Sequence, residues 1–234
     1  MLEISKIRAI TLDLDDTLWP VWPTIDRAEL ALEAWLSPRA PAAAALIAQP
    51  ASRLALREHV TQTHPAKGHD MSFIRLEMIR VALQRTGASL ALAEPAFEVF
   101  LARRMVVDLY EDALPALEFL AQRFPLVAVS NGNACVNRVG IGAHFYASVS
   151  AHVLGVAKPD PRIFQAAAAA AGVAADAVLH IGDDAALDVL GGLAAGMQTV
   201  WVNRDAHVWE HEAQPHLTVR SLDVLCDLFR ERST

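Results

Sequence analysis

Carboxylate, hydroxyl and amine side chains gather in four short stretches of this 234-residue chain. The stretches are Asp13-Leu14-Asp15-Asp16-Thr17, Ser130-Asn131-Gly132-Asn133, Lys158-Pro159, and Gly182-Asp183-Asp184 with Asp188. Carboxylates in one cleft raise one another's pKa unless a cation lies among them. Ligation by carboxylate, carbonyl and water oxygens suits Mg²⁺, and Lys158 adds a fixed positive charge. With a hydroxyl such as that of Ser130, these groups could bind and activate a phosphoryl group.

Hydrolysis of a phosphate monoester needs several groups at once, because it is among the slowest uncatalysed reactions, with accelerations of up to about 10²¹-fold. We expect Asp13 to attack phosphorus and form an aspartyl-phosphate. Asp15, two residues later, would protonate the leaving oxygen and then activate water. The strand ends at this point, so a turn must direct both carboxylates inward.

The surrounding residues predict the elements that carry these stretches. Ile7–Leu14 is an apolar, β-branched run typical of a buried strand. Three further strands are predicted, each preceded by a helix. The strands are Leu126–Val129, Ala177–Ile181 and Thr199–Val202, and the helices are Leu114–Arg123, Pro161–Ala171 and Ala186–Ala195. This alternation predicts an α/β fold, a Rossmann-like parallel sheet with helices on both faces, and the polar stretches should meet at one edge of it.

A block with helical periodicity, from about Thr24 to Leu109, separates the first strand from the rest. Thr24 and Ser72 are predicted to cap helices within it. We therefore expect an α/β core of residues 1–18 and 110–234, with an all-helical cap, 19–109, inserted into it. Ligands are expected at the carboxyl ends of the strands, beneath the cap.

Composition excludes several other classes of protein. The net charge is −7, and no run of Lys and Arg is present, so binding to nucleic acid or to an anionic membrane is not expected. The N-terminal residues lack the pattern of a signal peptide, and no apolar run could span a membrane. Two cysteines make no disulfide framework, which favours the cytoplasm. The sequence leaves the oligomeric state open.

The four stretches resemble the motifs of the haloacid dehalogenase superfamily. The first motif, DxDxT, is present at residues 13–17, and the second, a Ser or Thr after an apolar strand, is present as Ser130. The third is Lys158 before a proline, and the fourth, GDxxxxD, spans residues 182–188. All four occur in the order typical of the superfamily, and the helical insertion resembles its α-helical cap type.

This resemblance implies a role for each of the main site residues. Asp13 would be the nucleophile and Asp15 the acid and base. Ser130 would bind phosphoryl oxygens, and Lys158 would neutralise the phosphate and the nucleophile. Dehalogenases of the superfamily lack the second Asp of the first motif, so its presence favours a phosphatase that acts on small phosphorylated molecules.

The resemblance also implies a Mg²⁺ site. Asp13, the carbonyl of Asp15, and Asp183 would bind the ion, with Asp184 or Asp188 supporting it through water. Asp184 and Asp188 have an alternative interpretation, since an acidic side chain at a helix N-terminus stabilises the helix without any metal.

A narrower resemblance concerns bacterial phosphatases that act on FMN and on the phosphorylated ribitylamino-uracil intermediate of riboflavin synthesis. It is carried by residues 125–134, 180–204 and 215–222, and in the cap by His69, Asp70 and Arg75. It implies that these three cap residues contact substrate, although His69 and Asp70 could equally form an ordinary loop.

Four further residues are candidates for substrate contacts. Trp19 and Trp22 follow the catalytic aspartates, where they could stack on a flat substrate or pack as part of a hinge. Asn131 and Gly132 could shape the loop after Ser130 or touch the substrate.

Three alternative functions remain open. A phosphomutase of the same superfamily would keep both Asp13 and Asp15. A phospho-accepting signalling domain also combines aspartates, a hydroxyl and a lysine, although such domains carry no inserted cap. The last alternative is a non-catalytic binding protein, which the intact set of charged residues argues against.

Overall fold

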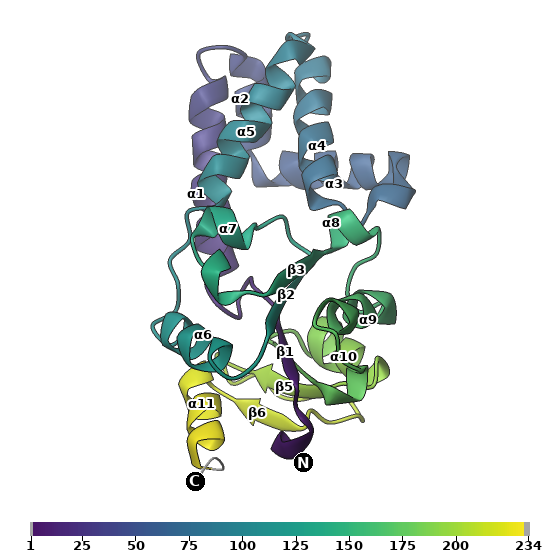
Figure 1. The fold of residues 1–234 in the computed structure, drawn as a ribbon. Helices are drawn as coiled ribbons and strands as arrows, with labels where there is room; N and C mark the ends of the chain where they lie inside the picture. The colour runs from purple at the N-terminus through teal and green to yellow at the C-terminus, as the bar shows by residue number, and fades with distance from the viewer. Residues whose placement is uncertain (1, 232–234) are drawn as a thin grey trace. The chain divides into compact units, whose positions relative to one another are not determined.

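The computed structural model describes residues 2–231 and divides the chain into two compact units. The first unit is an α/β unit made of Met1–Pro20 and Asp108–Thr234, and the second is a helical unit, Val21–Val107. Figure 1 shows the strands gathered in the first unit and the long helices α1 to α5 in the second. The domain boundaries expected from the sequence, after residues 18 and 109, stay a prediction.

The α/β unit is built on a six-stranded sheet in which every neighbouring pair is parallel, in the order β3-β2-β1-β4-β5-β6. The strands are β1 (Ala9–Leu12), β2 (Leu126–Ser130), β3 (Ala147–Ser150), β4 (Val178–Gly182), β5 (Gln198–Val202) and β6 (Leu217–Val219). This is the strand order of dinucleotide-binding Rossmann folds, so the predicted fold class is confirmed.

Helices lie on both faces of the sheet, as expected for a parallel sheet. In Figure 1, α6 (Ala113–Ala121) and α11 (Leu222–Glu231) lie on one side of it, and α9 (Pro161–Ala170) and α10 (Gly191–Ala194) lie on the other. All residues of β1, β2, β4 and β5 are consequently buried. Shorter elements join them: α7 (Val136–Val139), α8 (Ala151–Leu154), and the single turns Ile4–Lys6, Gly142–His144 and Ala175–Ala177.

The strand order reverses between β1 and β4, since the chain runs from β1 through β2 to β3 and then returns to the other side of β1. A crevice forms at such a reversal, at the carboxyl ends of the strands. Asp13 directly follows β1, and Asp183 directly follows β4. The backbone N–H of Asp13 donates to the carbonyl of Ile181 at 2.9 Å, which fixes the two strand ends side by side.

The helical unit buries its own apolar core, contributed by all five of its long helices. These are α1 (Val21–Leu36), α2 (Pro41–Ala48), α3 (Pro50–Thr63), α4 (Met71–Arg85) and α5 (Ala93–Arg104), with single turns at Pro65–Lys67 and Leu90–Leu92. No strand occurs among the described residues of this unit. None of the helices formed by residues 2–231 combines the length and apolar character needed to cross a bilayer.

Several local predictions were wrong. Thr24 does not cap α1, because that helix begins at Val21 and accommodates Pro23 in its first turn, where no hydrogen bond is lost. Asp70, not Ser72, caps α4 by accepting from the N–H of Phe73 at 2.9 Å. The predicted helix 186–195 begins instead as a π-helical turn, Ala185–Leu190 (η6), that continues into α10.

Candidate active site

A buried lysine lies between two of the predicted site carboxylates. The Lys158 ammonium donates to Asp13, and it donates to Oδ1 of Asp188 at 2.6 Å. The side chains of Lys158 and Asp188 are 3% and 1% exposed, and that of Asp13 is 10% exposed. Burial alone would lower the pKa of Lys158, but the two carboxylates outweigh it and raise that pKa above its usual value. Lys158 is therefore a permanent cation.

Asn131 fixes the backbone from which this lysine extends. Its side-chain oxygen accepts from the backbone N–H of Lys158 at 2.7 Å, and its side-chain NH₂ donates to the Lys158 carbonyl at 2.9 Å. The loop after β2 is thereby joined to the segment before α9. Asn131 thus shapes the loop after Ser130, one of the two roles expected for it, and its contact with substrate stays a prediction.

Ser130, at the end of β2, is 3% exposed, and its Oγ accepts from the N–H of Gly132 at 2.9 Å. The bond closes a tight turn that keeps the hydroxyl at the carboxyl end of the sheet. Gly132 thus shapes the loop after Ser130, and its contact with substrate stays a prediction.

Both carboxylate oxygens of Asp188 accept hydrogen bonds. Besides Lys158, its Oδ1 contacts Nε2 of His180 at 3.1 Å, and its Oδ2 accepts from the backbone N–H of Asp184 at 3.0 Å. Burial would raise the pKa of Asp188, but Lys158 and the bond from His180 outweigh it and hold that pKa well below its usual range. Asp188 is therefore an anion that neutralises and orients Lys158.

His180 is a buried supporting residue of β4. Burial lowers its pKa, so the ring is neutral. Because Asp188 can only accept, Nε2 of His180 carries the proton, and Nδ1 accepts from the hydroxyl of Thr11 at 2.7 Å. Thr11 and His180 are both completely buried, and together they anchor the network inside the sheet.

The negative charge of Asp183 is less well balanced than that of Asp188, which contacts Lys158 directly. Its Oδ1 accepts from the Thr17 hydroxyl at 2.8 Å. Burial raises the pKa of Asp183 to about 7, and the nearby charge of Asp188 adds to that rise. Burial also raises the pKa of Asp13 well above its usual value, helped by the charges of Asp188 and Asp183 and opposed by Lys158.

These carboxylates form a cluster whose charge fits a divalent cation. Asp13, Asp183 and Asp188 each offer an oxygen within 4.8 Å of the others. Three carboxylates and one ammonium leave two negative charges when all are ionised, and an all-oxygen donor set suits Mg²⁺. Hydrogen bonds are made to both oxygens of Asp188 but to one oxygen each of Asp13 and Asp183, so Asp13 and Asp183 are better placed to hold the ion.

Asp184 is not part of the cluster. Its side chain is exposed, and Oδ1 accepts from the N–H groups of Ala186 and Leu187, both at 2.8 Å. It caps the π-helical turn, which is the alternative interpretation given above for this residue. Support of the metal by Asp184 through water stays a prediction.

Asp15 is oriented by Trp19. The indole N–H of Trp19 donates to Oδ1 of Asp15 at 2.8 Å, and Trp19 itself has no exposed surface. Asp16, between them, has a positive φ of 58° and donates its N–H to the Trp19 carbonyl at 2.7 Å. This tight turn holds the Asp15 carboxylate half-buried. Trp19 is accordingly a positioning residue, and it offers no free ring face for substrate.

The other predicted contact residues belong to the helical unit. Trp22 is 71% exposed in the first turn of α1, and His69 precedes Asp70, the cap of α4. Arg75 is engaged within the unit, where it pairs with Glu29 at 2.6 Å and its guanidinium lies 4.2 Å from the centre of the Phe100 ring. Their contact with substrate stays a prediction.

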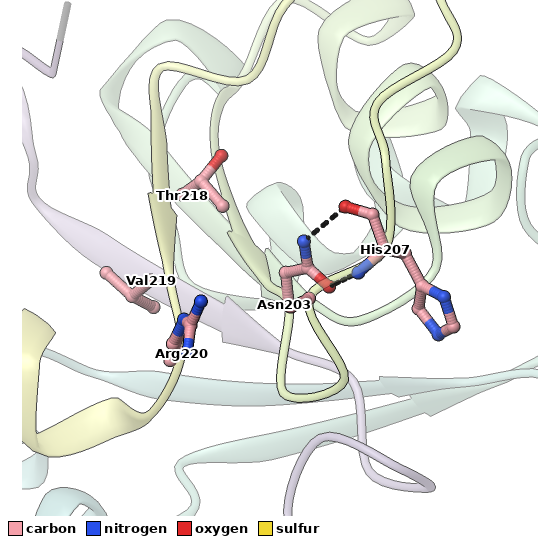
Figure 2. Close-up of a pocket in the computed structure, with 6 residues that line it drawn as sticks. Asn203, His207, Thr218, Val219 and Arg220 are labelled. Atoms are coloured by element: carbon pink, nitrogen blue, oxygen red, sulfur yellow. Dashed lines mark hydrogen bonds between the residues drawn. The ribbon is translucent and has the colours of Figure 1, made fainter.

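The structure also contains a surface hollow of about 340 Å³ in the α/β unit. Figure 2 shows five of its lining residues, Asn203, His207, Thr218, Val219 and Arg220, around the turn after β5 and along β6. None of the residues predicted to act in the site lines it. The candidate site is therefore the acidic cluster and not this hollow.

Comparison with known proteins establishes the family. Residues 7–196 match the haloacid dehalogenase-like hydrolases, so the chain belongs to this family of hydrolytic enzymes. It is 31% identical over 233 residues to 5-amino-6-(5-phospho-D-ribitylamino)uracil phosphatase YigB of Escherichia coli (strain K12), covering 96% of this chain and 97% of that protein. It is 32% identical over 154 residues to a phosphoserine phosphatase of Thermus thermophilus, covering 63% and 62% of the two chains.

Among solved structures, a 2-haloacid dehalogenase from Pseudomonas syringae pv. Tomato DC3000 superimposes with a TM-score of 0.89 at 35% sequence identity. The match covers 96% of this chain and 99% of that one. The resemblance stated from the motifs is confirmed at the level of the family. The relatives include both phosphatases and dehalogenases, so the type of bond that this chain cleaves has to be argued from its own residues.

The raised pKa of Asp183 predicts how stability depends on pH without metal. In the unfolded chain this carboxyl loses its proton at about pH 4. In the folded protein it keeps the proton up to about pH 7. The folded state therefore binds more protons in this interval, and the free energy of unfolding should fall as pH rises through it. Chemical denaturation of EDTA-treated protein at several pH values would measure this. Asp183→Asn, which cannot titrate, should lose less stability over the interval, and equal slopes would contradict the prediction.

A second prediction concerns Gly182, the last residue of β4. A methyl group on Gly182 would lie 2.3 Å from Cγ of Asp188, so Asp188 would have to move. We expect Gly182→Ala to lower the free energy of unfolding by about 1–3 kcal/mol, measured by urea denaturation. Gly68→Ala is the control, since its added methyl group meets nothing closer than 3.7 Å. Equal stability of the two variants would show that Asp188 is not held rigidly.

Proposed function

We propose that this hydrolase is a Mg²⁺-dependent phosphatase of small phosphomonoesters that works through an aspartyl-phosphate on Asp13. The observation that carries the proposal is the pair of carboxylates after β1. Asp13 contacts Lys158, and Asp15 is oriented separately by the Trp19 indole at 2.8 Å. One carboxylate is thus placed with a permanent cation, and the other is oriented by an indole N–H.

The reaction divides between these residues. Asp13 attacks phosphorus while Lys158 balances the negative charge of the nucleophile and of the phosphoryl oxygens. The hydroxyl of Ser130 is available to a phosphoryl oxygen at the same edge of the sheet. Asp15 gives a proton to the leaving oxygen and later takes one from the water that hydrolyses the aspartyl-phosphate.

Asp13, the Asp15 carbonyl and Asp183 would hold Mg²⁺. The bound ion would supply positive charge that reduces the repulsion between the Asp13 carboxylate and the phosphoryl group of the substrate. The fit rests on the buried cluster of Asp13, Asp183 and Asp188, in which three carboxylates face a single ammonium. Burial is the main cause of the raised pKa values of Asp13 and Asp183, and repulsion among the carboxylates of the cluster adds to it. A divalent ion would remove the repulsion that causes part of them.

The second candidate is a haloacid dehalogenase, favoured by the structural match at 35% identity. The two reactions differ in what the leaving group requires. A halide departs as a stable anion, but the alkoxide that leaves a phosphate ester needs a proton. Asp15 is the residue able to supply one, and a dehalogenase has no use for it. Asp15 and its bond from Trp19 therefore favour the phosphatase.

The first substrates to test are FMN and the phosphorylated ribitylamino-uracil of riboflavin synthesis. The Escherichia coli relative, whose name specifies the second of these, matches nearly the full length of both chains. The core handles only the phosphoryl group, so selection of the leaving group falls to the helical unit and to residues 18–23. Cytoplasmic location and the lack of a nucleic-acid partner stay predictions.

Incubation with FMN, the ribitylamino-uracil phosphate, sugar phosphates and a 2-haloacid, with Mg²⁺ or with EDTA, tests the proposal. We expect phosphate release that requires Mg²⁺, and no halide release. Asp13→Asn should lower kcat by at least about 10⁴-fold because the nucleophile is lost, while its circular dichroism spectrum stays unchanged.

Other outcomes of this panel separate the alternatives. Halide release would favour the dehalogenase, and isomerised sugar phosphate without net release would favour a phosphomutase. A long-lived acyl-phosphate without turnover would favour a phospho-accepting domain. Failure of every substrate to react would favour a non-catalytic binding protein.

Lys158→Arg tests the role of the buried cation. The two carboxylate contacts are made by a compact ammonium that is 3% exposed, and a guanidinium is larger and planar. We expect kcat for phosphate release to fall by at least about 100-fold. Lys6→Arg, at an exposed ion pair with Glu3, is the matched control and should keep full activity. Normal turnover by Lys158→Arg would contradict this role.

A further inference from the structure

Arg204, two residues beyond the end of β5, joins three segments of the α/β unit. Its Nη2 donates to the carbonyl of Thr17 at 2.8 Å, and its Nη1 lies 3.1 Å from a carboxylate oxygen of Asp112. The guanidinium also lies over the ring of Tyr110, 3.9 Å from its centre. Arg204 thereby connects the segment after β5 to the loop after β1, which carries Asp13 and Asp15.

Thr17 links Arg204 to the candidate metal site. Its carbonyl accepts from Arg204, and its hydroxyl donates to Oδ1 of Asp183 at 2.8 Å. A second group from the same end of β5 holds the backbone of that residue, since the indole N–H of Trp201 donates to the Asp183 carbonyl at 2.7 Å. Asp183 is thus held at its side chain from the β1 side and at its main chain from the β5 side.

The position of Arg204 is itself constrained. Asn203 donates from its side-chain NH₂ to the carbonyl of His207 at 2.9 Å and accepts from the His207 N–H at 2.8 Å. Figure 2 shows these two bonds between Asn203 and His207. They close the turn of residues 203–207, which includes Arg204 in the sequence. The backbone N–H of Asn203 is fixed as well, by the Val219 carbonyl of β6 at 2.8 Å.

The contribution of Arg204 to the stability of the fold does not by itself explain why a guanidinium lies here. Nε of Arg204 is buried and has no hydrogen-bond partner among the described residues. A buried polar group left unsatisfied costs about 1–3 kcal/mol, and a buried ion pair often stabilises a fold no better than apolar residues of similar volume. A benefit at the site would explain why the guanidinium is there.

We infer that Arg204 and Trp201 are positioning residues that hold Asp183 ready to bind the divalent cation. This inference rests on the proposed function. Groups that orient a metal ligand typically change metal affinity by 10- to 100-fold when they are removed. Loss of Arg204 would free Thr17 and its hydroxyl, and loss of the Trp201 N–H would free the Asp183 main chain.

Calorimetric titration of EDTA-treated, dialysed protein with Mg²⁺ measures the effect without any substrate. Arg204→Met removes the charge and both hydrogen-bonding groups but keeps much of the apolar stem. We expect it to raise the Kd for Mg²⁺ by about 10-fold, and Arg204→Lys to restore part of the affinity. Trp201→Phe, which keeps a ring but lacks the N–H, should raise the Kd in the same way and provides the test if Arg204→Met does not fold.

Asp112→Asn is the matched control for general loosening. It weakens the ion pair with Arg204 and the bond from the Leu222 N–H, at 2.6 Å, but leaves the contact of Arg204 with Thr17. We expect a lower melting temperature and an unchanged Kd for Mg²⁺. If Asp112→Asn weakens Mg²⁺ binding as much as Arg204→Met, the effect is loss of stability and the inference is overturned.

A double-mutant cycle tests the route through Thr17. Thr17→Val removes the hydroxyl that holds Asp183 and keeps the carbonyl that Arg204 binds. Adding Arg204→Met to Thr17→Val should then cause little further loss of affinity, and fully additive losses would overturn the inference. A wild-type protein that binds no Mg²⁺ overturns the proposed metal dependence instead. Wild-type binding with an unchanged Kd in both Arg204→Met and Trp201→Phe overturns this inference alone.

Discussion

The contact of the Lys158 ammonium with Asp13 and Asp188 is the interaction on which the rest of the site depends. Removing three charged groups from water carries a cost that their mutual attraction repays only when further hydrogen bonds complete the arrangement. Here those bonds come from Asn131 to the Lys158 backbone and from His180 to Asp188. These hydrogen bonds offset part of the free-energy cost of burying the three charged groups.

The fold supplies this support because of where its strand order reverses. Parallel strands bring their carboxyl ends to one edge, and β1 and β4 lie side by side at the reversal. Asp13 and Asp183 therefore become neighbours although they are 170 positions apart in the sequence. Both strands are completely buried, so packing on both faces holds their carboxyl ends in place. Insertion of the helical unit between β1 and β2 leaves this edge of the sheet intact, since both of its connections are made in loops.

The sequence was sufficient for features that follow from local pattern. The central strands were predictable because long apolar runs bounded by polar residues have few alternatives. The edge strands β3 and β6 were missed because they are short and partly exposed, so no run marks them. His180, flanked by apolar strand residues, is typical of a packed, hydrogen-bonded core residue, and the structure agrees. The contacts of Arg204 were missed, since they join distant segments and no local pattern marks them.

Asp184 and Asp188 have different contacts in the structure, although the motif alone does not distinguish them. Asp184 caps the π-helical turn, and the backbone N–H of Asp184 binds Asp188, so one residue shapes the turn that presents the other to Lys158. With Asp188 committed to that ion pair, the second carboxylate near Asp13 is that of Asp183, whose pKa is raised mainly by burial and further by the charge of Asp188, with Lys158 only partly opposing the rise. A divalent ion between Asp13 and Asp183 would complete the charge balance, and this incomplete balance, more than the number of carboxylates, is the physical reason to assign a metal to this edge of the sheet.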